Sequence, residues 1–273
     1  MSSIPFAREI EINKSFLYDF SICTLVTKKD EYSEMLESFV SAGFDTESCE
    51  YLFIDNCETN KVDAYKGINI LIQEAQGKYI IICHQDILLN FDKRKKLEDC
   101  IAEIDKLDSN WGILSNTAVF NMLHMSLNVT YPDGNYDKKG KFPLLAKSVD
   151  EHFILTKKSA NISLSNDLQG YHMYGTDMCL LADIRGYSAY GIDFSLTHKS
   201  RGIIDASFHK SKNALRKKYS KAFRSKYVST TITSFYISNN IFKSWFFNQK
   251  RIKKLSKSIM KKINFLNKTL CTF

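Results

Sequence analysis

Short apolar runs and helical stripes alternate along the first 115 residues of the chain. The runs are rich in β-branched and aromatic residues and predict strands buried on both faces. They cover residues 22–27, 51–55, 79–83 and 111–115. The stripes, with apolar residues spaced three and four apart, predict helices. They cover residues 32–44, 63–75 and 97–107. This alternation predicts an α/β fold with a mostly parallel sheet flanked by helices.

The pattern becomes less regular beyond residue 115. Residues 121–147 are polar and rich in turn residues, so we expect a loop region that acts as a flexible lid. A strand is expected over residues 152–156, and Gly175-Thr176-Asp177 opens a helix that ends at Gly186. A last strand is expected over residues 187–192.

The distribution of charge divides the chain into two parts, residues 1–205 and 206–273. The chain has 38 Lys or Arg and 30 Asp or Glu, but 17 of the basic residues and none of the acidic ones lie in residues 206–273. Residues 1–205 therefore carry 21 basic and 30 acidic side chains. A block with one sign of charge repels itself and is typical of a surface that meets an anionic partner.

The basic segment ends in an expected amphipathic helix. Its apolar residues follow a three-and-four spacing at positions 252, 255, 259, 263, 266 and 270. We expect it to lie on an anionic membrane, where each Lys or Arg contributes about 1 kcal/mol. The helix could instead pack on the rest of the chain or on a second subunit. A nucleic-acid partner is disfavoured because no recognition module is present, and His209 reads as part of the basic segment.

Cysteine usage and the absence of a leader indicate the compartment. The seven cysteines contain no CxxC pair, and several lie in apolar runs, which predicts buried free thiols rather than disulfides or a zinc site. The first residues lack a secretory apolar region, and no stretch of 18 apolar residues occurs. We expect a cytoplasmic protein that is peripherally associated with the inner face of the cell membrane.

Polar groups follow three of the predicted strands. They are Thr27, Asp55-Asn56 and His84-Gln85-Asp86. Ligands of open α/β sheets bind beyond the carboxyl ends of the strands. These three strand ends therefore predict a ligand site.

The order of the motifs resembles a known family. SICTLVT, YLFIDN, QGKYIIICHQDI, WGILS, DEHFILTKKS, GYHMYGTDMCLLADIRGY and THKS follow one another between residues 20 and 205. The series resembles the GT-A glycosyltransferases of the family 2 kind from bacterial polysaccharide synthesis. The resemblance implies a GT-A-like fold and a divalent metal, Mn²⁺ or Mg²⁺. It also implies transfer from a nucleotide-sugar, expected to be a UDP-sugar, to a saccharide or lipid-linked acceptor in surface glycan synthesis.

The resemblance also implies roles for residues of the donor side. Asp86 matches the metal-binding last position of a DxD motif, in which His84 replaces the first Asp and contacts metal, sugar or phosphate. His198 matches a histidine that completes the metal shell. Asp55, with Asn56, and Thr27 match positions that hold the nucleoside. The alternatives are a polar strand end for HQD and a simple turn for Asp55-Asn56.

On the acceptor side, the resemblance makes Asp177 the catalytic base of an inverting transfer. Asp150 matches a carboxylate that binds donor or acceptor hydroxyls, and His172 and Tyr174 fall where the acceptor side is lined. Asp177 could instead only stabilise the start of a helix. A non-catalytic nucleotide- or glycan-binding scaffold on the membrane is the alternative function. A nucleotidyltransferase is disfavoured, because no glycine-rich phosphate loop follows the first strand.

Overall fold

The computed structural model describes residues 6–7, 15–202 and 204–266, with side chains through residue 261. The chain forms two compact units, Met1–Leu215 and Arg216–Phe273. The division falls within helix α5 (Ala206–Ala222), ten residues beyond the change in charge. The two units are described separately.

A seven-stranded sheet forms the centre of the first unit, in the order β2-β1-β3-β11-β5-β12-β9. Its strands are β1 (Tyr18–Val26), β2 (Cys49–Asp55), β3 (Gly77–Cys83), β5 (Trp111–Ser115), β9 (Leu144–Ala146), β11 (Phe153–Lys157) and β12 (Ser188–Gly191). Only β11 and β9 run antiparallel to their neighbours. The expected α/β fold with a mostly parallel sheet is therefore confirmed.

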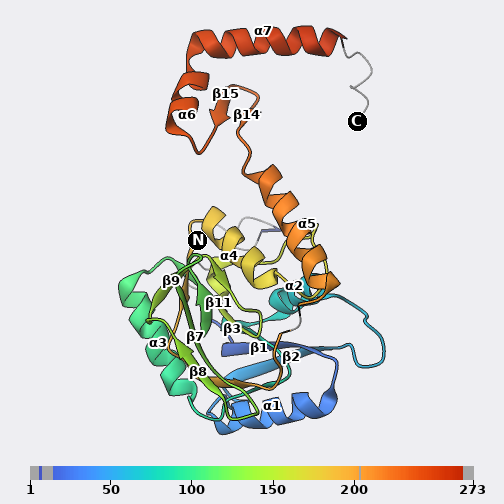
Figure 1. The fold of residues 1–273 in the computed structure, drawn as a ribbon, viewed down its shortest axis with the longest axis vertical. Coiled ribbons are helices and arrows are strands. Elements are labelled where there is room, and N and C mark those ends of the chain that lie inside the picture. Colours follow the sequence, from blue (N-terminus) through green and yellow to red (C-terminus); the bar gives the residue numbers. More distant parts are fainter. Residues whose placement is uncertain (1–5, 8–14, 203, 267–273) are drawn as a thin grey trace. The chain divides into compact units, whose positions relative to one another are not determined.

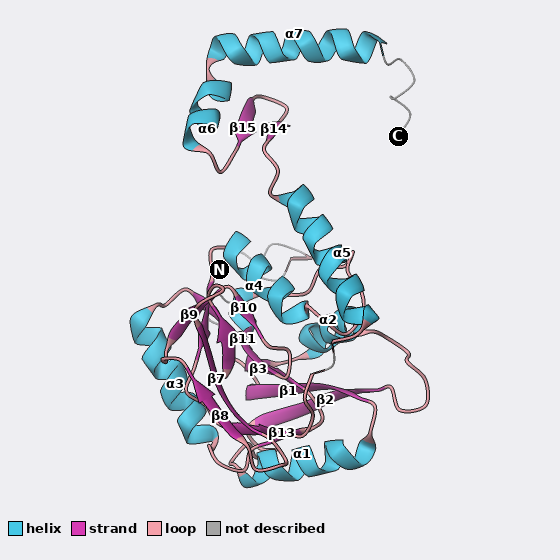
Figure 2. Cartoon of the chain, in the orientation of Figure 1, coloured by secondary structure: helices cyan, strands magenta, loops and turns pink. Residues whose placement is uncertain are grey.

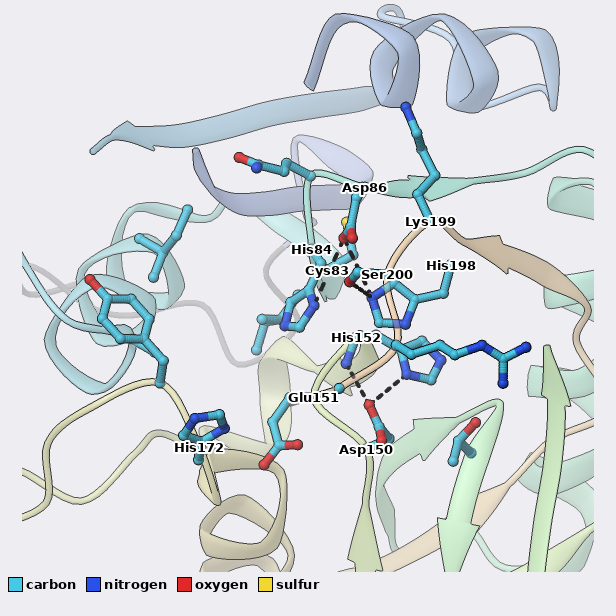
Figure 3. A pocket seen from close by; sticks show the side chains of 18 of the residues that line it. Cys83, His84, Asp86, Asp150, Glu151, His152, His172, His198, Lys199 and Ser200 are labelled. Carbon is cyan, nitrogen blue, oxygen red and sulfur yellow. Dashed lines mark hydrogen bonds and ion pairs between the residues drawn. The ribbon is translucent and has the colours of Figure 1, made fainter. Parts of the chain in front are cut away.

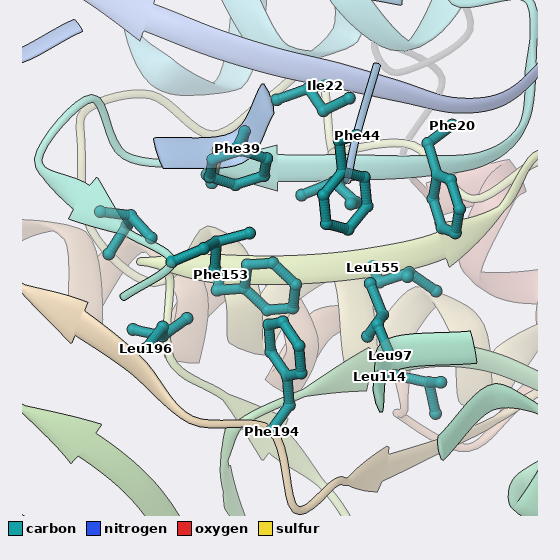
Figure 4. Packing of buried hydrophobic residues seen from close by; sticks show 14 of the residues in the cluster. Phe20, Ile22, Phe39, Phe44, Leu97, Leu114, Phe153, Leu155, Phe194 and Leu196 are labelled. Carbon is teal, nitrogen blue, oxygen red and sulfur yellow. The ribbon is translucent and has the colours of Figure 1, made fainter. Parts of the chain in front are cut away.

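Helices cover both faces of this sheet (Figure 2). They are α1 (Lys29–Ser41), α2 (Ala64–Glu74), α3 (Arg94–Leu107) and α4 (Tyr174–Ile184), with a 3-10 turn at Lys158–Ala160. Asp63 caps α2 by accepting a hydrogen bond from the N–H of Lys66 at 3.0 Å. Phe39 of α1 and Leu97 of α3 meet Phe20, Ile22 and Phe153 of the sheet in one cluster of buried side chains (Figure 4).

A second sheet replaces the expected lid. It comprises β10 (Ser148–Val149), β6 (Thr117–Val119), β7 (Met125–Thr130), β13 (Leu196–His198) and β4 (Ile87–Leu88), with β8 (Tyr136–Lys139) beside β7. The prediction of a loop over residues 121–147 was wrong. In β7, Met125, Leu127 and Val129 alternate with polar residues, which is the pattern of a strand, but the turn residues that follow it led to the prediction of a loop.

The direction of β11 matters for the site. Because β11 is antiparallel to β3, Phe153 at its start pairs with Cys83 at the end of β3. The N–H of His84 continues the ladder by donating to the carbonyl of His152 at 3.0 Å. The segment Asp150–His152 therefore lies at the edge of the sheet where β3 ends.

The second unit is small and has its own packing. β14 (Lys226–Ser229) and β15 (Ser234–Ile237) form an antiparallel hairpin, followed by α6 (Ile241–Asn248) and α7 (Lys250–Leu266) (Figure 1). Among the described residues, no helix has both the length and the apolar character needed to cross a bilayer. Of the expected apolar stripe of α7, Leu270 and the side chains of Ile263 and Leu266 lie outside the described residues.

Candidate functional site

A pocket of about 830 Å³ opens at the carboxyl ends of β1 and β3, where the sequence placed a ligand site. The segment Asp150–His152, just before β11, lines it, as do Leu127 and Val129 of the second sheet. Seven residues that the sequence singled out line it: Thr27, His84, Asp86, Asp150, His172, Tyr174 and His198. A volume of this size is within the range of small-molecule sites in proteins.

His84, Asp86 and His198 form the chemical centre of the pocket (Figure 3). Nε2 of His198 lies 3.5 Å and Nδ1 of His84 lies 4.0 Å from Oδ1 of Asp86. The three ligand atoms all lie within 4.8 Å of one another. Pairing of β4 with β13 brings them together, because His198 is opposite Ile87, the residue after Asp86. Two imidazoles and one carboxylate could hold a divalent metal.

Tyr174 fixes the form of His84 that can bind a metal. The Tyr174 hydroxyl donates to the carbonyl of Glu151 at 3.0 Å and lies 3.0 Å from Nε2 of His84. Since the hydroxyl has a single proton, Nε2 of His84 donates to it and Nδ1 keeps a free electron pair toward Asp86. Tyr174 is buried but still lines the pocket, and its place on the acceptor side stays a prediction.

The charges of the cluster suit a cation. Enclosure by the pocket and repulsion from His198 lower the pKa of His84 to about 4, which keeps this ring neutral at pH 7. Enclosure opposes ionisation of Asp86, but hydrogen bonds from His198 and Ser200 outweigh it and lower the pKa of the carboxyl. Neutral imidazole and ionised carboxylate are the ligand forms of these groups.

Asp150 and His152 form a second polar group beside the cluster. Asp150 Oδ1 accepts from Nδ1 of His152 at 2.6 Å, and Nε2 of His152 lies 2.9 Å from Oδ1 of Asn116. Both ring nitrogens of His152 therefore have an oxygen partner. Its ring stacks on His198 with centroids 4.9 Å apart. Enclosure opposes ionisation of Asp150, but His152 outweighs it and lowers the pKa of this carboxyl.

Glu151 is a site residue that the sequence did not single out. Its carboxyl lines the pocket next to the start of α4. Burial and the negative charge of Asp150 raise the pKa of Glu151 to about 7. Hydrogen bonds from the backbone N–H groups of Gly175 and Met173 act in the opposite direction but are weaker. Gly175 permits the close approach of the start of α4 to the segment that leads to Glu151, because a Cβ here would collide with the carbonyl of Val149. A carboxylate with such a pKa can accept a proton near neutral pH.

Gln85 connects the HQD segment to the first strand. Its Oε1 accepts from the backbone N–H groups of Thr27 at 2.6 Å and Lys28 at 3.0 Å. Its Nε2 donates to Oγ1 of Thr27 and to Glu31. The middle residue of the motif therefore fixes the end of β1 against the end of β3. Lys28, Lys199 and Arg201 also line the pocket, each in an ion pair with a carboxylate.

Asp55 and Asn56 are not among the described residues that line the pocket. Asp55 accepts from the N–H of Cys57 at 2.9 Å and pairs with Lys29 at 3.0 Å, and these contacts lower the pKa of its carboxyl. Asn56 is buried and donates to the carbonyl of Val62 at 2.9 Å. Both residues shape the turn after β2, which is the alternative that the sequence left open.

Asp177 does not fit the role of catalytic base. Its side chain is 0% exposed, and it accepts hydrogen bonds from the N–H and the hydroxyl of Ser165, at 2.8 and 2.7 Å. It is not among the described residues that line the pocket. An acceptor hydroxyl cannot reach the Asp177 carboxylate, because the side chain is fully buried and each of its oxygens accepts a hydrogen bond from Ser165. Asp177 ties the loop before α4 to the first turn of that helix.

Comparison with known proteins gives one relative by sequence. A protein named "ATP synthase subunits region ORF 6" from Fuscovulum blasticum is 33% identical over 217 residues, which cover 75% of this chain and 84% of that protein. The chain belongs to the family of this protein. Its name describes an open reading frame and states no activity. No family model matches the chain.

Two solved structures resemble the fold at a distance. TarS of S. aureus, residues 1–349, crystallised with UDP-GlcNAc, is 15% identical with a TM-score of 0.47. The match covers 68% of this chain and 60% of TarS 1–349, so the chain spans three fifths of that fragment. The mannosyltransferase PcManGT of Pyrobaculum calidifontis, with GDP-Man and Mn²⁺, is 11% identical with a TM-score of 0.46 over 77% of this chain and 68% of that chain.

Replacing Tyr174 by Phe tests the metal cluster. We expect Asp86→Asn to abolish Mn²⁺ binding measured by calorimetry, and Tyr174→Phe to weaken it about 10–100-fold, because His84 loses its orienting partner. Tyr65→Phe is the matched control, since Tyr65 is also buried but donates to the carbonyl of His172. Unchanged affinity in Tyr174→Phe, or equal losses in both Tyr variants, contradicts the assignment.

Replacing Asp177 by Asn tests its structural role. The amide offers one oxygen where two donors of Ser165 bind, so we expect a loss of about 1–3 kcal/mol in the free energy of unfolding. Urea denaturation measures this loss, and Ser165→Ala is the control that removes only the hydroxyl donor. A variant of unchanged stability that has lost all turnover would return Asp177 to the role of base.

Proposed function

We propose that this protein is a metal-dependent glycosyltransferase that moves a sugar from a nucleotide-sugar to an acceptor hydroxyl. One observation carries the proposal. A cluster that could hold a metal, His84-Asp86-His198, shares its pocket with Glu151, whose pKa is raised to about 7. Metal ligands and a proton acceptor within one cleft are what transfer from a diphosphate to a hydroxyl requires.

The donor diphosphate is proposed to bind at the metal cluster. His84, Asp86 and His198 would hold a divalent cation, Mn²⁺ or Mg²⁺, which would neutralise the charge of the departing nucleoside diphosphate. Lys28, Lys199 and Arg201 line the same pocket, and they would contact the diphosphate by exchanging their present carboxylate partners for it. Thr27, which Gln85 holds by two hydrogen bonds, would contact the nucleoside of a UDP-sugar.

Glu151 is proposed to act as the base. As the acceptor oxygen attacks the anomeric carbon, the bond from that carbon to the phosphate oxygen breaks and the hydroxyl proton passes to the Glu151 carboxylate. The nucleoside diphosphate leaves with the bonding electron pair. A single displacement inverts the configuration at the anomeric carbon. Asp150, held by His152, and His172 are placed to bind sugar hydroxyls.

The resemblance of the motif series supports the finer part of the proposal. It favours a UDP-sugar as donor and a saccharide or lipid-linked glycan of a bacterial surface as acceptor. The non-catalytic scaffold remains the alternative. It predicts nucleotide-sugar binding with Mn²⁺ but neither donor hydrolysis nor transfer across a panel of nucleotide-sugars and acceptors. The raised pKa of Glu151 favours the enzyme, since a binding scaffold has no need of a proton acceptor.

Replacing Glu151 by Gln is the direct test. We expect transfer to fall at least about 100-fold, because the acceptor proton has no carboxylate to receive it. Donor binding, measured by calorimetry with Mn²⁺ present, should persist, because Glu151 does not belong to the metal cluster. Glu37→Gln, on the exposed side of α1, is the control. Full transfer in Glu151→Gln rules out this mechanism.

The pH dependence follows from the pKa of Glu151. Only the ionised carboxylate accepts a proton, and its pKa is raised to about 7. The rate of transfer at saturating donor should therefore rise with pH through about 7 and level off above it. Initial rates across pH 5.5–9 measure the profile. A flat profile over this interval contradicts the role of Glu151.

A further inference from the structure

Helix α6 of the second unit carries its apolar side chains on the outside. Ile241, Phe242 and Trp245 are 87%, 69% and 60% exposed, and Phe246 is also exposed. Ile241 and Trp245 lie one turn apart, as do Phe242 and Phe246, so the four side chains occupy one continuous side of the helix. A surface helix of a water-soluble domain normally shows the opposite arrangement, with polar residues outward.

The inner side of α6 shows that this arrangement is built into the fold. Phe247 packs on Tyr236 and Tyr227 of the hairpin, with ring centroids 4.7 and 6.4 Å apart. Asn248, the next residue, donates to the carbonyl of Tyr236 and accepts from its N–H, both at 2.9 Å. These contacts fix the rotation of α6 about its axis, so the exposed apolar arc cannot turn inward.

Helix α7 continues the pattern with charge added. Leu255 and Ile259 lie one turn apart and are exposed, whereas Ser256 contacts the hydroxyl of Tyr227 at 3.1 Å. Lys254, Lys257 and Lys261 are exposed on the other side of the helix. The apolar and the basic residues of α7 are therefore both available to a partner.

The charge of the unit indicates the partner. Residues 216–273 contain 15 Lys or Arg and no Asp or Glu. An apolar face inside a field of one sign is poorly suited to a second copy of the same chain, because the like charges of the two copies would repel each other. The combination of an apolar face with surrounding positive charge suits the interface of a bilayer, where anionic headgroups cover apolar acyl chains.

We propose that α6 and α7 form a docking surface for an anionic phospholipid bilayer. Ile241, Phe242 and Trp245 enter the boundary between headgroups and acyl chains, and Leu255 and Ile259 of α7 rest on it. The lysines of α7 remain at headgroup level. This proposal does not depend on the glycosyltransferase activity, and its test uses neither donor nor metal, so either proposal can fail without the other.

The two tryptophans of the chain supply the experiment. Trp111 is buried in the first unit and Trp245 is exposed in the second. In full-length Trp111→Phe, we expect the emission of Trp245 to shift to shorter wavelength on vesicles of phosphatidylcholine mixed with phosphatidylglycerol. Vesicles of phosphatidylcholine alone should produce a much smaller shift. Trp245→Phe, which reports only Trp111, should show no shift on either.

Co-sedimentation with the same vesicles tests the surface by substitution. We expect Phe242→Ser/Trp245→Ser to weaken binding at least about tenfold. The matched control is Leu107→Ser/Ile184→Ser, which removes two residues of similar exposure, 60% and 56%, from the first unit. Salt screens the attraction between lysines and anionic headgroups, since the Debye length falls from about 10 Å at 0.1 M to about 3 Å at 1 M. Lys254→Gln/Lys257→Gln/Lys261→Gln removes three of these charges, so it should weaken binding and make the remaining binding less sensitive to salt.

Three outcomes overturn the proposal. The first is the absence of a Trp245 shift with anionic vesicles. The second is a shift that depends on protein concentration without vesicles, which assigns the surface to a second copy. The third is a shift produced by duplex DNA but not by vesicles, which assigns it to a nucleic acid.

Discussion

The site depends on the antiparallel insertion of β11 between β3 and β5. The hydrogen bond from His84 N–H to the carbonyl of His152 closes the last rung of this pairing. It places the turn with Asp150 and Glu151 directly across from the HQD segment. If β11 ran parallel to β3, the same residues would lie at the opposite edge of the sheet, more than a strand length from the pocket.

The polar groups at this edge have contrasting electrostatic states within a short distance. His84 is neutral and Asp86 is ionised, because the pKa of each lies below its ordinary range. The pKa of Glu151 is instead raised to about 7. The difference arises from partners. Asp86 receives hydrogen bonds from His198 and Ser200, and Glu151 faces the charge of Asp150 in a desolvated position. Separation of pKa values in one cleft is a mark of functional sites.

Much of the first unit could be predicted from the sequence, because its signals are local. Buried runs such as YIIIC and WGILS have the β-branched and aromatic content of strands covered on both faces, and Asp63 marks the start of α2 by its capping side chain. The strands of residues 125–146 were not predicted, although Met125, Leu127 and Val129 alternate with polar residues as in a strand. Their polar residues Ser126 and Asn128 are buried against neighbouring strands, and that burial is invisible to a local pattern.

The sequence by itself determined the α/β alternation, the three polar strand ends and the separation of charge at about residue 206. All three are set by composition and period along the chain. Only the tertiary structure decided which carboxylates face the pocket. Asp177 looked like a base because it opens a helix, but Ser165 encloses it, while Glu151 reaches the cleft through the reversal of β11. Strand direction and burial depend on contacts between distant segments, and spacing along the chain does not encode them.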